Sequence, residues 1–351
     1  MAEYSGRYKL FDTAGMRTYS VLTRKNKMSY KDFVVCEKLM RQDSIYPNKD
    51  VEAVASAIVD AHLQKKPVIV FTGAHSIKNG LSPIYIDLMK RGIITHIATN
   101  GAGTIHDFEI AALGETSEDV RGVLGSGDFG MAFETCMILN QTYIEGNRQK
   151  LGYGESLGRL YNDWSFRRKV LTEVFDTVAD KSGYMIPEKF NFLDYSIMAS
   201  AYKYNVPATV HVSIGTDVND QHVNFDGAAK GGASGRDFLI YTQTVSQLTG
   251  GGVVLNIGSA VTGPEVLLKA VSMVTNKGFK PDKIICADFD IRPSGSDGGV
   301  YDESKYYYYF RDQKSVVTRI PKVFNGSGFY IEGDQKQTIT GLYQNVMRRL
   351  K

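Results

Sequence analysis

Glycine and small hydroxyl residues gather in four short stretches of the sequence, each directly after an apolar run. They are residues 72–80, 99–107, 256–260 and 287–299. Glycine lets backbone amides approach a phosphate closely, and a helix that begins there adds a partial positive charge. The stretches therefore suit a phosphate or a nucleotide. Each one alone is more typical of a plain strand-to-helix turn, and none completes the G-x-G-x-x-G dinucleotide fingerprint.

Acidic side chains form a second group of candidates. Asp217, Asp220 and His222 lie in a polar loop, and Asp297 lies in the last glycine-containing stretch. The Asp-x-x-Asp-x-His spacing could also ligate a divalent metal, although nothing else in the sequence demands one. Asp297, between a serine and a glycine, could equally be a turn residue.

His106 and Asp107 could form a general base with its orienting carboxylate. Neighbouring residues of a helix point about 100° apart and seldom bond each other. We therefore favour the plainer interpretation that this pair marks the capped start of a helix.

Helices and strands alternate along the chain and would position these candidates. The pattern from residue 68 to 99 reads strand, loop, helix and strand, which is the βαβ unit of a parallel sheet. The expected fold class is α/β: a Rossmann-like parallel sheet flanked by helices on both faces. Loops after the carboxyl ends of such strands form the ligand crevice, and the glycine-containing stretches lie there. Helices are expected at residues 51–64, 81–91, 195–204, 238–248 and 264–276, and buried strands at 68–71, 93–99, 206–212, 252–257 and 283–287.

The chain divides into an arm and one large domain. Residues 1–50 are rich in charge and tyrosine without a clear period, which indicates an N-terminal arm. Residues 51–351 are expected to form a single α/β domain with a polar helical insertion around 125–189. Glycine-rich residues 227–235 are expected to be a loop. The tyrosine run 306–309 is expected to be a partly buried strand or an interface, with an aromatic cage around an ammonium as the alternative.

Composition excludes several functions. The 351 residues carry 41 Lys and Arg against 38 Asp and Glu, and the two signs are interspersed, which argues against a nucleic-acid partner. No apolar run approaches the ~20 residues of a membrane span, and the first residues lack the apolar region of a signal peptide. The three cysteines have no motif partners, so we expect a reducing, cytoplasmic environment.

Several of these motifs resemble the deoxyhypusine synthase family. Residues 72–108 are similar to its nucleotide-binding half, and residues 292–304 to its C-terminal site loop. The match runs with gaps from about Val51 to Phe310, and the motifs keep their order. The resemblance implies a homotetrameric, NAD-dependent amine transferase. In that family the nicotinamide takes a hydride from spermidine, and an aminobutyl group passes through a catalytic lysine to a lysine of a translation factor or, in a related branch, to a second polyamine.

The resemblance also assigns site residues. Asp297 and Glu303 would hold the cationic amine, and the loop with Asp217, Asp220 and His222 corresponds to further cofactor and substrate carboxylates of the family. The NAD contacts would fall on Gly73, Ala74, His75, Thr99, Asn100, Gly101, Ala102, Gly103, Gly258 and Ser259.

The chain departs from the family at its catalytic groups. The position of the catalytic lysine falls on Tyr309 or Phe310, which leaves Lys305 as the local candidate for imine formation. The family's histidine base aligns with Gly263 or Pro264. In the first glycine loop the family's acidic pair is replaced by residues 105 and 106.

Three hypotheses follow from these observations. The first is a divergent deoxyhypusine-synthase-like enzyme that uses NAD to dehydrogenate a polyamine or related amine, with transfer of an aminobutyl group to a protein or amine acceptor. The second keeps NAD but acts on a guanidino or amino compound without a covalent lysine. The third is a nucleotide-binding scaffold that has lost the chemistry.

Overall fold

A parallel sheet of six strands forms the centre of the protein, of which the computed structural model describes residues 4–176, 178–295 and 304–351. The strand order is β5-β3-β2-β6-β7-β8, with every neighbouring pair parallel. The expected α/β class is confirmed. The strands are β2 (Val68–Thr72), β3 (His96–Asn100), β5 (Ala208–His211), β6 (Val253–Ile257), β7 (Ile285–Asp290) and β8 (Ser327–Glu332), and a separate antiparallel pair joins β1 (Asn26–Ser29) to β4 (Glu115–Glu118).

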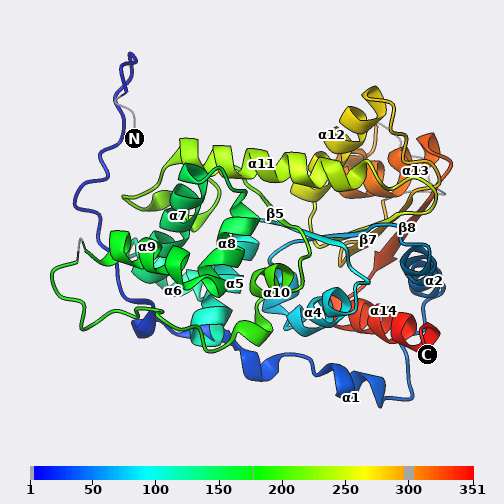
Figure 1. Cartoon of the computed structure of the whole chain (residues 1–351), viewed down its shortest axis with the longest axis horizontal. Helices are drawn as coiled ribbons and strands as arrows, with labels where there is room; N and C mark the ends of the chain where they lie inside the picture. Colours follow the sequence, from blue (N-terminus) through cyan, green and yellow to red (C-terminus); the bar gives the residue numbers. More distant parts are fainter. Residues whose placement is uncertain (1–3, 177, 296–303) are drawn as a thin grey trace.

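Helices cover both faces of the sheet (Figure 1). They are α1 (Cys36–Met40), α2 (Lys49–Leu63), α3 (His75–Lys78), α4 (Ser82–Lys90), α5 (Gly101–Leu113), α6 (Val120–Val123), α7 (Phe133–Arg148), α8 (Tyr153–Asn162), α9 (Trp164–Phe175), α10 (Ile197–Lys203), α11 (Gly227–Val245), α12 (Thr262–Asn276), α13 (Ile320–Val323) and α14 (Gln335–Arg349). Short 3-10 helices lie at η1 (Val21–Thr23), η2 (Tyr30–Asp32), η3 (Leu193–Tyr195), η4 (Val218–Gln221) and η5 (Tyr306–Tyr309), and a π-helical segment, η6, spans Gln313–Arg319.

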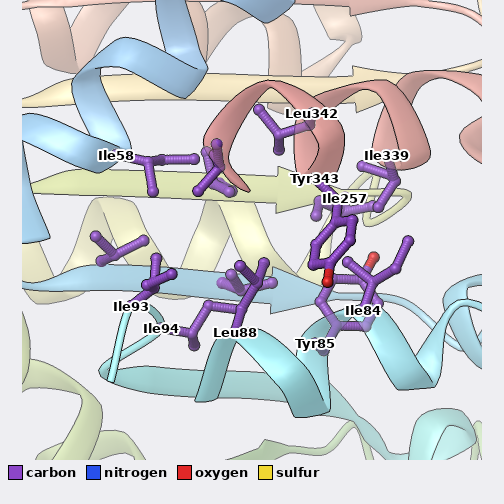
Figure 2. Packing of buried hydrophobic residues seen from close by; sticks show 14 of the residues in the cluster. Ile58, Ile84, Tyr85, Leu88, Ile93, Ile94, Ile257, Ile339, Leu342 and Tyr343 are labelled. Atoms are coloured by element: carbon purple, nitrogen blue, oxygen red, sulfur yellow. The ribbon is translucent and has the colours of Figure 1, made fainter. Parts of the chain in front are cut away.

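The central strand β2 shows how the apolar runs build two cores. All five of its residues are buried, because successive side chains of a strand point to opposite faces and both faces are covered. Val68 and Val70 pack with α2, α4 and α14, whereas Ile69 and Phe71 pack with α11 and α12. Figure 2 shows the first of these cores, where side chains of α2, α4 and α14 converge over the sheet.

A third core lies beside the sheet, where α5 packs with α7, α8 and α9. These helices occupy much of the expected insertion, but they are not mainly polar on their packed faces. Most of α7 is buried, including Glu134, Asn140 and Glu145. Buried polar groups need partners, and Glu134 finds them in the N-terminal arm: it accepts hydrogen bonds from Ser20 Oγ at 2.6 Å and from the Val21 backbone at 2.7 Å.

Two local expectations are wrong, and one strand lies where the sequence predicts none. Residues 227–235 are not a loop but the first half of α11, because Asp226 caps the helix by accepting from the Ala229 backbone. The tyrosine run is not a strand but the 3-10 helix η5. The sequence does not predict the half-exposed edge strand β8, because Gly326 precedes it, Gly328 is its second residue and only Ile331 is fully buried.

Neither a membrane helix nor a disulfide occurs in the part of the chain that the structure describes. No described helix is long and apolar enough to cross a bilayer. Cys36, Cys136 and Cys286 are free thiols, and the last two are buried.

Asp237 of α11 ties three elements together. Its Oδ2 accepts from the Gly154 backbone at the start of α8 (2.9 Å) and from the Val210 backbone in β5 (2.8 Å). The carboxyl is fully buried, and burial raises its pKa to about 7.

We expect Asp237→Asn to weaken the pH dependence of stability. The pKa is higher in the folded state than in the unfolded state, so Asp237 stabilises the fold below about pH 4, and this stability is lost as the pH rises through about 7. The slope is at most about 1.4 kcal/mol per pH unit. Urea denaturation from pH 4 to 8 gives the free energy of unfolding of wild type and variant, and the difference between their pH slopes is the contribution of Asp237. Equal slopes in the two proteins would contradict the raised pKa of Asp237.

Candidate functional site

The strand order reverses between β2 and β6, and their loops meet at two glycines. The Gly73 backbone donates to Ile257 O at 2.9 Å, and a Cβ on Gly73 would lie only 2.4 Å from Gly258 O. Gly258 itself has a positive φ of 61° and donates to Phe289 O at 3.0 Å. Glycine is therefore required at position 73 by close backbone contact. Such a reversal opens a crevice at the carboxyl edge of a parallel sheet, where ligands bind.

A buried polar pair lies at the ends of β6 and β7 beside these loops. Asn256 Nδ2 donates to Asp288 Oδ1 at 2.7 Å and to Ser259 O at 2.8 Å. Asn256 Oδ1 and Asp288 Oδ2 are buried without a hydrogen-bond partner, and burial raises the pKa of Asp288 well above its usual value. Ser259 Oγ accepts from the Gly263 backbone at 2.9 Å. Two side-chain oxygens near the strand reversal thus have no hydrogen-bond partner.

The second glycine loop is not an open phosphate cradle. Asn100 caps α5 by accepting from the Gly103 backbone at 3.1 Å. A Cβ on Gly101 would lie 1.8 Å from a carboxylate oxygen of Asp217, and one on Gly103 would lie 2.1 Å from Thr99 Oγ1. Gly101 was expected to make room for a pyrophosphate, but it makes room for the chain's own carboxylate. The positive end of the α5 dipole explains why a carboxylate is stable there.

Asp217 and Asp220 share a buried lysine, Lys230, that the expected loop at 227–235 did not single out. Lys230 Nζ donates to Asp217 at 2.8 Å and to Asp220 at 2.5 Å, and its side chain is fully buried. Burial raises the pKa of Asp217, and the Lys230 charge opposes that shift. Lys230 is the one charged residue in a run of small residues, and that isolation was a signal available in the sequence. A loop at 227–235 gives it no defined position. In α11 the same run places Lys230 in the second helical turn.

The three residues of the metal alternative do not come together in this loop. His222 turns away from the two aspartates, and its Nε2 contacts Gly130 O at 2.9 Å. Burial lowers the pKa of His222. Within the described ranges, no three His, Cys, Asp or Glu side chains come together as a metal site.

A cavity of about 220 Å³ lies against one face of α5. Ala102, Ile105, His106 and Glu109 line it at helical spacing, so they share that face. Its other walls come from the arm, α3, β4, the start of α7 and the loop after β5. They include Arg24, Lys78, Ser117, Glu118, Gly130, Thr135, Thr216 and Asp217. The cavity therefore brings together residues from segments far apart in the sequence.

Most charges around this cavity are paired. Glu109 and Arg24 form a buried ion pair at 2.7 Å, and Glu109 also accepts from Thr116 Oγ1 (2.6 Å) and Thr135 Oγ1 (3.1 Å). Glu118 accepts from Tyr19 Oη at 2.5 Å and from the Gly130 backbone at 3.1 Å. Lys78 is the exception, since its ammonium has no partner among the described residues.

His106 belongs to the same network, and it does not bond Asp107. His106 Nδ1 lies 2.7 Å from Thr116 Oγ1, and burial lowers the pKa of this imidazole to about 4. Asp107 points toward another face of α5, where it accepts from Ser196 Oγ (2.6 Å) and the Ile197 backbone (2.7 Å). The partner of His106 is thus a threonine bound to Glu109, and the three-residue spacing of His106 and Glu109 was a signal available in the sequence.

The other expected site residues lie apart from the network of His106, Thr116 and Glu109, or they lie outside the residues that the structure describes. Asp297 and Glu303 lie outside the described residues, as do most of the residues between the last glycine stretch and η5. Lys305 is exposed at the start of η5. The alternative for the tyrosine run is an aromatic cage around an ammonium. The ammonium that lies over one of its rings belongs to the chain itself, since Lys314 Nζ is 3.6 Å from the centre of the Tyr308 ring.

Comparisons with known proteins return matches in structure alone. No family model matches the chain, and no curated protein matches its sequence. Among solved structures, the chain is similar to the cyanobacterial arginine dihydrolase ArgZ, with 16% identity, a TM-score of 0.44, and coverage of 86% of this chain and 31% of ArgZ. A putative LOR/SDH protein from Methanococcus maripaludis S2 matches with 14% identity, a TM-score of 0.44, and coverage of 88% of this chain and 72% of that protein.

A third similar structure is AgrE in complex with ornithine and NAD+. It matches with 14% identity and a TM-score of 0.45, over 88% of this chain and 35% of AgrE. The chain thus spans about a third of the length of ArgZ and AgrE. Similarities of this size concern the course of the chain and not its chemistry, and the resemblance to deoxyhypusine synthase stays a prediction.

Removal of Lys230 tests whether its ion pairs hold the cavity wall. Lys230→Met leaves two buried carboxylates without a counter-charge, so we expect the free energy of unfolding at pH 7 to fall by about 3–5 kcal/mol. Lys269→Met is the control, since it breaks an exposed ion pair with Glu265 and should cost less than about 1 kcal/mol. Urea denaturation measures both. Equal losses in the two variants would show that the Lys230 pairs contribute no more than a surface pair.

Proposed function

We propose that this protein binds NAD at the carboxyl edge of its sheet and dehydrogenates a small amine or amino acid in the cavity beside α5. The observation that carries the proposal is the strand reversal between β2 and β6, where the loops meet at Gly73 and Gly258. Dinucleotides bind at such a reversal in open parallel sheets.

The residues at the reversal fit this cofactor. The backbone of Gly73, Ala74 and His75 and that of Gly258 and Ser259 would flank it. The buried pair Asn256 and Asp288 underlies these loops, and its two oxygens without partners mark an unsatisfied polar position beside the expected cofactor. The group would supply the hydride acceptor for the oxidation of a C–N bond. The stretch from Thr99 to Gly103, also expected to contact NAD, fits less well where Asp217 fills the space beside Gly101.

The cavity suits a molecule with charges of both signs. Glu118 and Asp217 contribute carboxylates to its lining, and Lys78 contributes an ammonium that no described residue neutralises. A charge-assisted hydrogen bond from Lys78 to a substrate carboxylate would satisfy that ammonium. This favours an amino acid over a simple polyamine, which carries no carboxylate.

Aminobutyl transfer is the finer form of this proposal. It requires a nucleophilic lysine, and the candidate is Lys305 with Asp297 and Glu303 as the amine-binding carboxylates. Lys305 is exposed, whereas Lys230, the fully buried lysine, is held by two carboxylates. The geometry therefore supports dehydrogenation better than transfer. A protein or amine acceptor, a homotetramer and a cytoplasmic location stay predictions, and the scaffold hypothesis is the outcome of the first test below.

NAD binding is tested at the half-buried Ala74. Ala74→Glu places a carboxylate beside the expected pyrophosphate, so we expect the NAD affinity to fall about tenfold or more. Ala179→Glu is the control, because Ala179 is exposed in a loop of the helical region. Isothermal calorimetry measures both. Absence of NAD binding by the wild type would contradict the proposal, and tight binding without reduction by any amine would favour the scaffold.

The substrate class is tested with molecules that differ by one carboxylate. Ornithine is putrescine with a carboxylate added, and arginine is likewise agmatine with one. We expect the amino acids to reduce NAD at lower concentration than the matching amines. In Lys78→Met the concentration of amino acid needed should rise by about ten- to a hundredfold, because the ammonium that binds its carboxylate is gone. Absorbance of NADH measures the rates. If putrescine, agmatine and spermidine are preferred in the wild type, the polyamine form of the proposal holds instead.

A further inference from the structure

The cavity beside α5 contains a hydrogen-bond chain that fixes the protonation of one histidine. Thr116 Oγ1 carries one proton and donates it to Glu109 Oε2 at 2.6 Å. Glu109 is an ion-paired carboxylate, which can only accept. The contact of 2.7 Å between Thr116 Oγ1 and His106 Nδ1 therefore requires the histidine to donate from Nδ1. In the neutral imidazole, the other nitrogen, Nε2, is then a bare acceptor.

This acceptor faces space and not protein. Nε2 of His106 has no hydrogen-bond partner among the described residues, and His106 lines the cavity. Nδ1 of His222 also has no partner, but that atom is fully buried, whereas Nε2 of His106 is not. Burial lowers the pKa of His106 to about 4, so the ring is neutral near pH 7 and its acceptor is present.

We propose that His106 is the acceptor that binds the N–H end of the substrate, and that Thr116, Glu109 and Arg24 are positioning residues that lock its tautomer. This inference rests on the proposed function for the identity of the substrate. It orients an amino acid in the cavity, with its amino or guanidino nitrogen at His106 and its carboxylate at Lys78. No proton leaves the substrate in this step, because an imidazole of such low pKa binds an ammonium without deprotonating it.

The lock excludes the opposite orientation. A carboxylate placed at Nε2 would face a lone pair and would gain no hydrogen bond there, while the buried acceptor would remain unsatisfied. His106 therefore selects a donor group, and Lys78 selects an acceptor group. The two residues together distinguish the two ends of the substrate.

The first arm of the test is nitrogen NMR of the histidine rings at pH 7. The chain has six histidines, and the signal lost in His106→Gln assigns His106. We expect a proton on Nδ1 and none on Nε2. Thr116→Val should allow the second tautomer. Thr135→Val is the matched control, because Thr135 also donates to Glu109 but does not contact His106. A proton on Nε2 in the wild type would overturn the inference.

The second arm is calorimetry with ornithine and putrescine in the presence of NAD. His106→Met removes the acceptor and should weaken binding about ten- to a hundredfold, whereas His106→Gln offers an amide oxygen and should restore most of it. NAD affinity should stay the same in both variants. If His106→Met binds as the wild type does, the role of His106 is contradicted. If the wild type binds neither compound, the proposed function is contradicted, and the tautomer still decides whether an acceptor faces the cavity.

Discussion

The rest of the structure depends on the burial of the polar side chains of helix α5. Nine of its thirteen residues are buried, among them Thr104, Asp107 and Glu109. A buried polar group without a partner costs about 1–3 kcal/mol, and more if it is charged. The partners of Asp107 come from α10, and those of Glu109 come from the arm, β4 and α7. One helix therefore fixes where the arm, α7, α10 and the adjoining strand β4 must lie, and the cavity forms where the arm, β4 and α7 meet it.

Much of the sheet could be predicted from the sequence because its strands are short apolar runs buried on both faces. Strand β2 is the clearest case, with all five residues buried. Strand β8 could not be predicted, because an edge strand buries few residues and keeps no such signal. The start of α11 was obscured by glycines, which have low helix propensity. Its cap at Asp226 and its packing against β5 and α7 override that propensity.

The candidate site was harder to predict because residue types do not reveal their partners. The sequence predicts that a ligand approaches the backbone of Gly101. The structure does have a group packed closely against Gly101, but that group is the carboxylate of Asp217. The sequence offers Asp107, the next residue, as a hydrogen-bond partner for His106, whereas the partner in the structure is Thr116 on β4. Arg24 lies in a segment without any period, so nothing marked it as the counter-charge of Glu109. Pairing at this distance is set by the tertiary fold.

The attachment of the arm has a consequence for local opening of the molecule. Ser20 reaches Glu134 across 114 residues of chain, and Arg24 forms its ion pair with Glu109 in the wall of the cavity. Residues 19–24 contribute no strand to the six-stranded sheet, so the sheet does not need these contacts. A local opening of residues 19–24, well short of global unfolding, would therefore remove one wall of the cavity and leave the sheet in place.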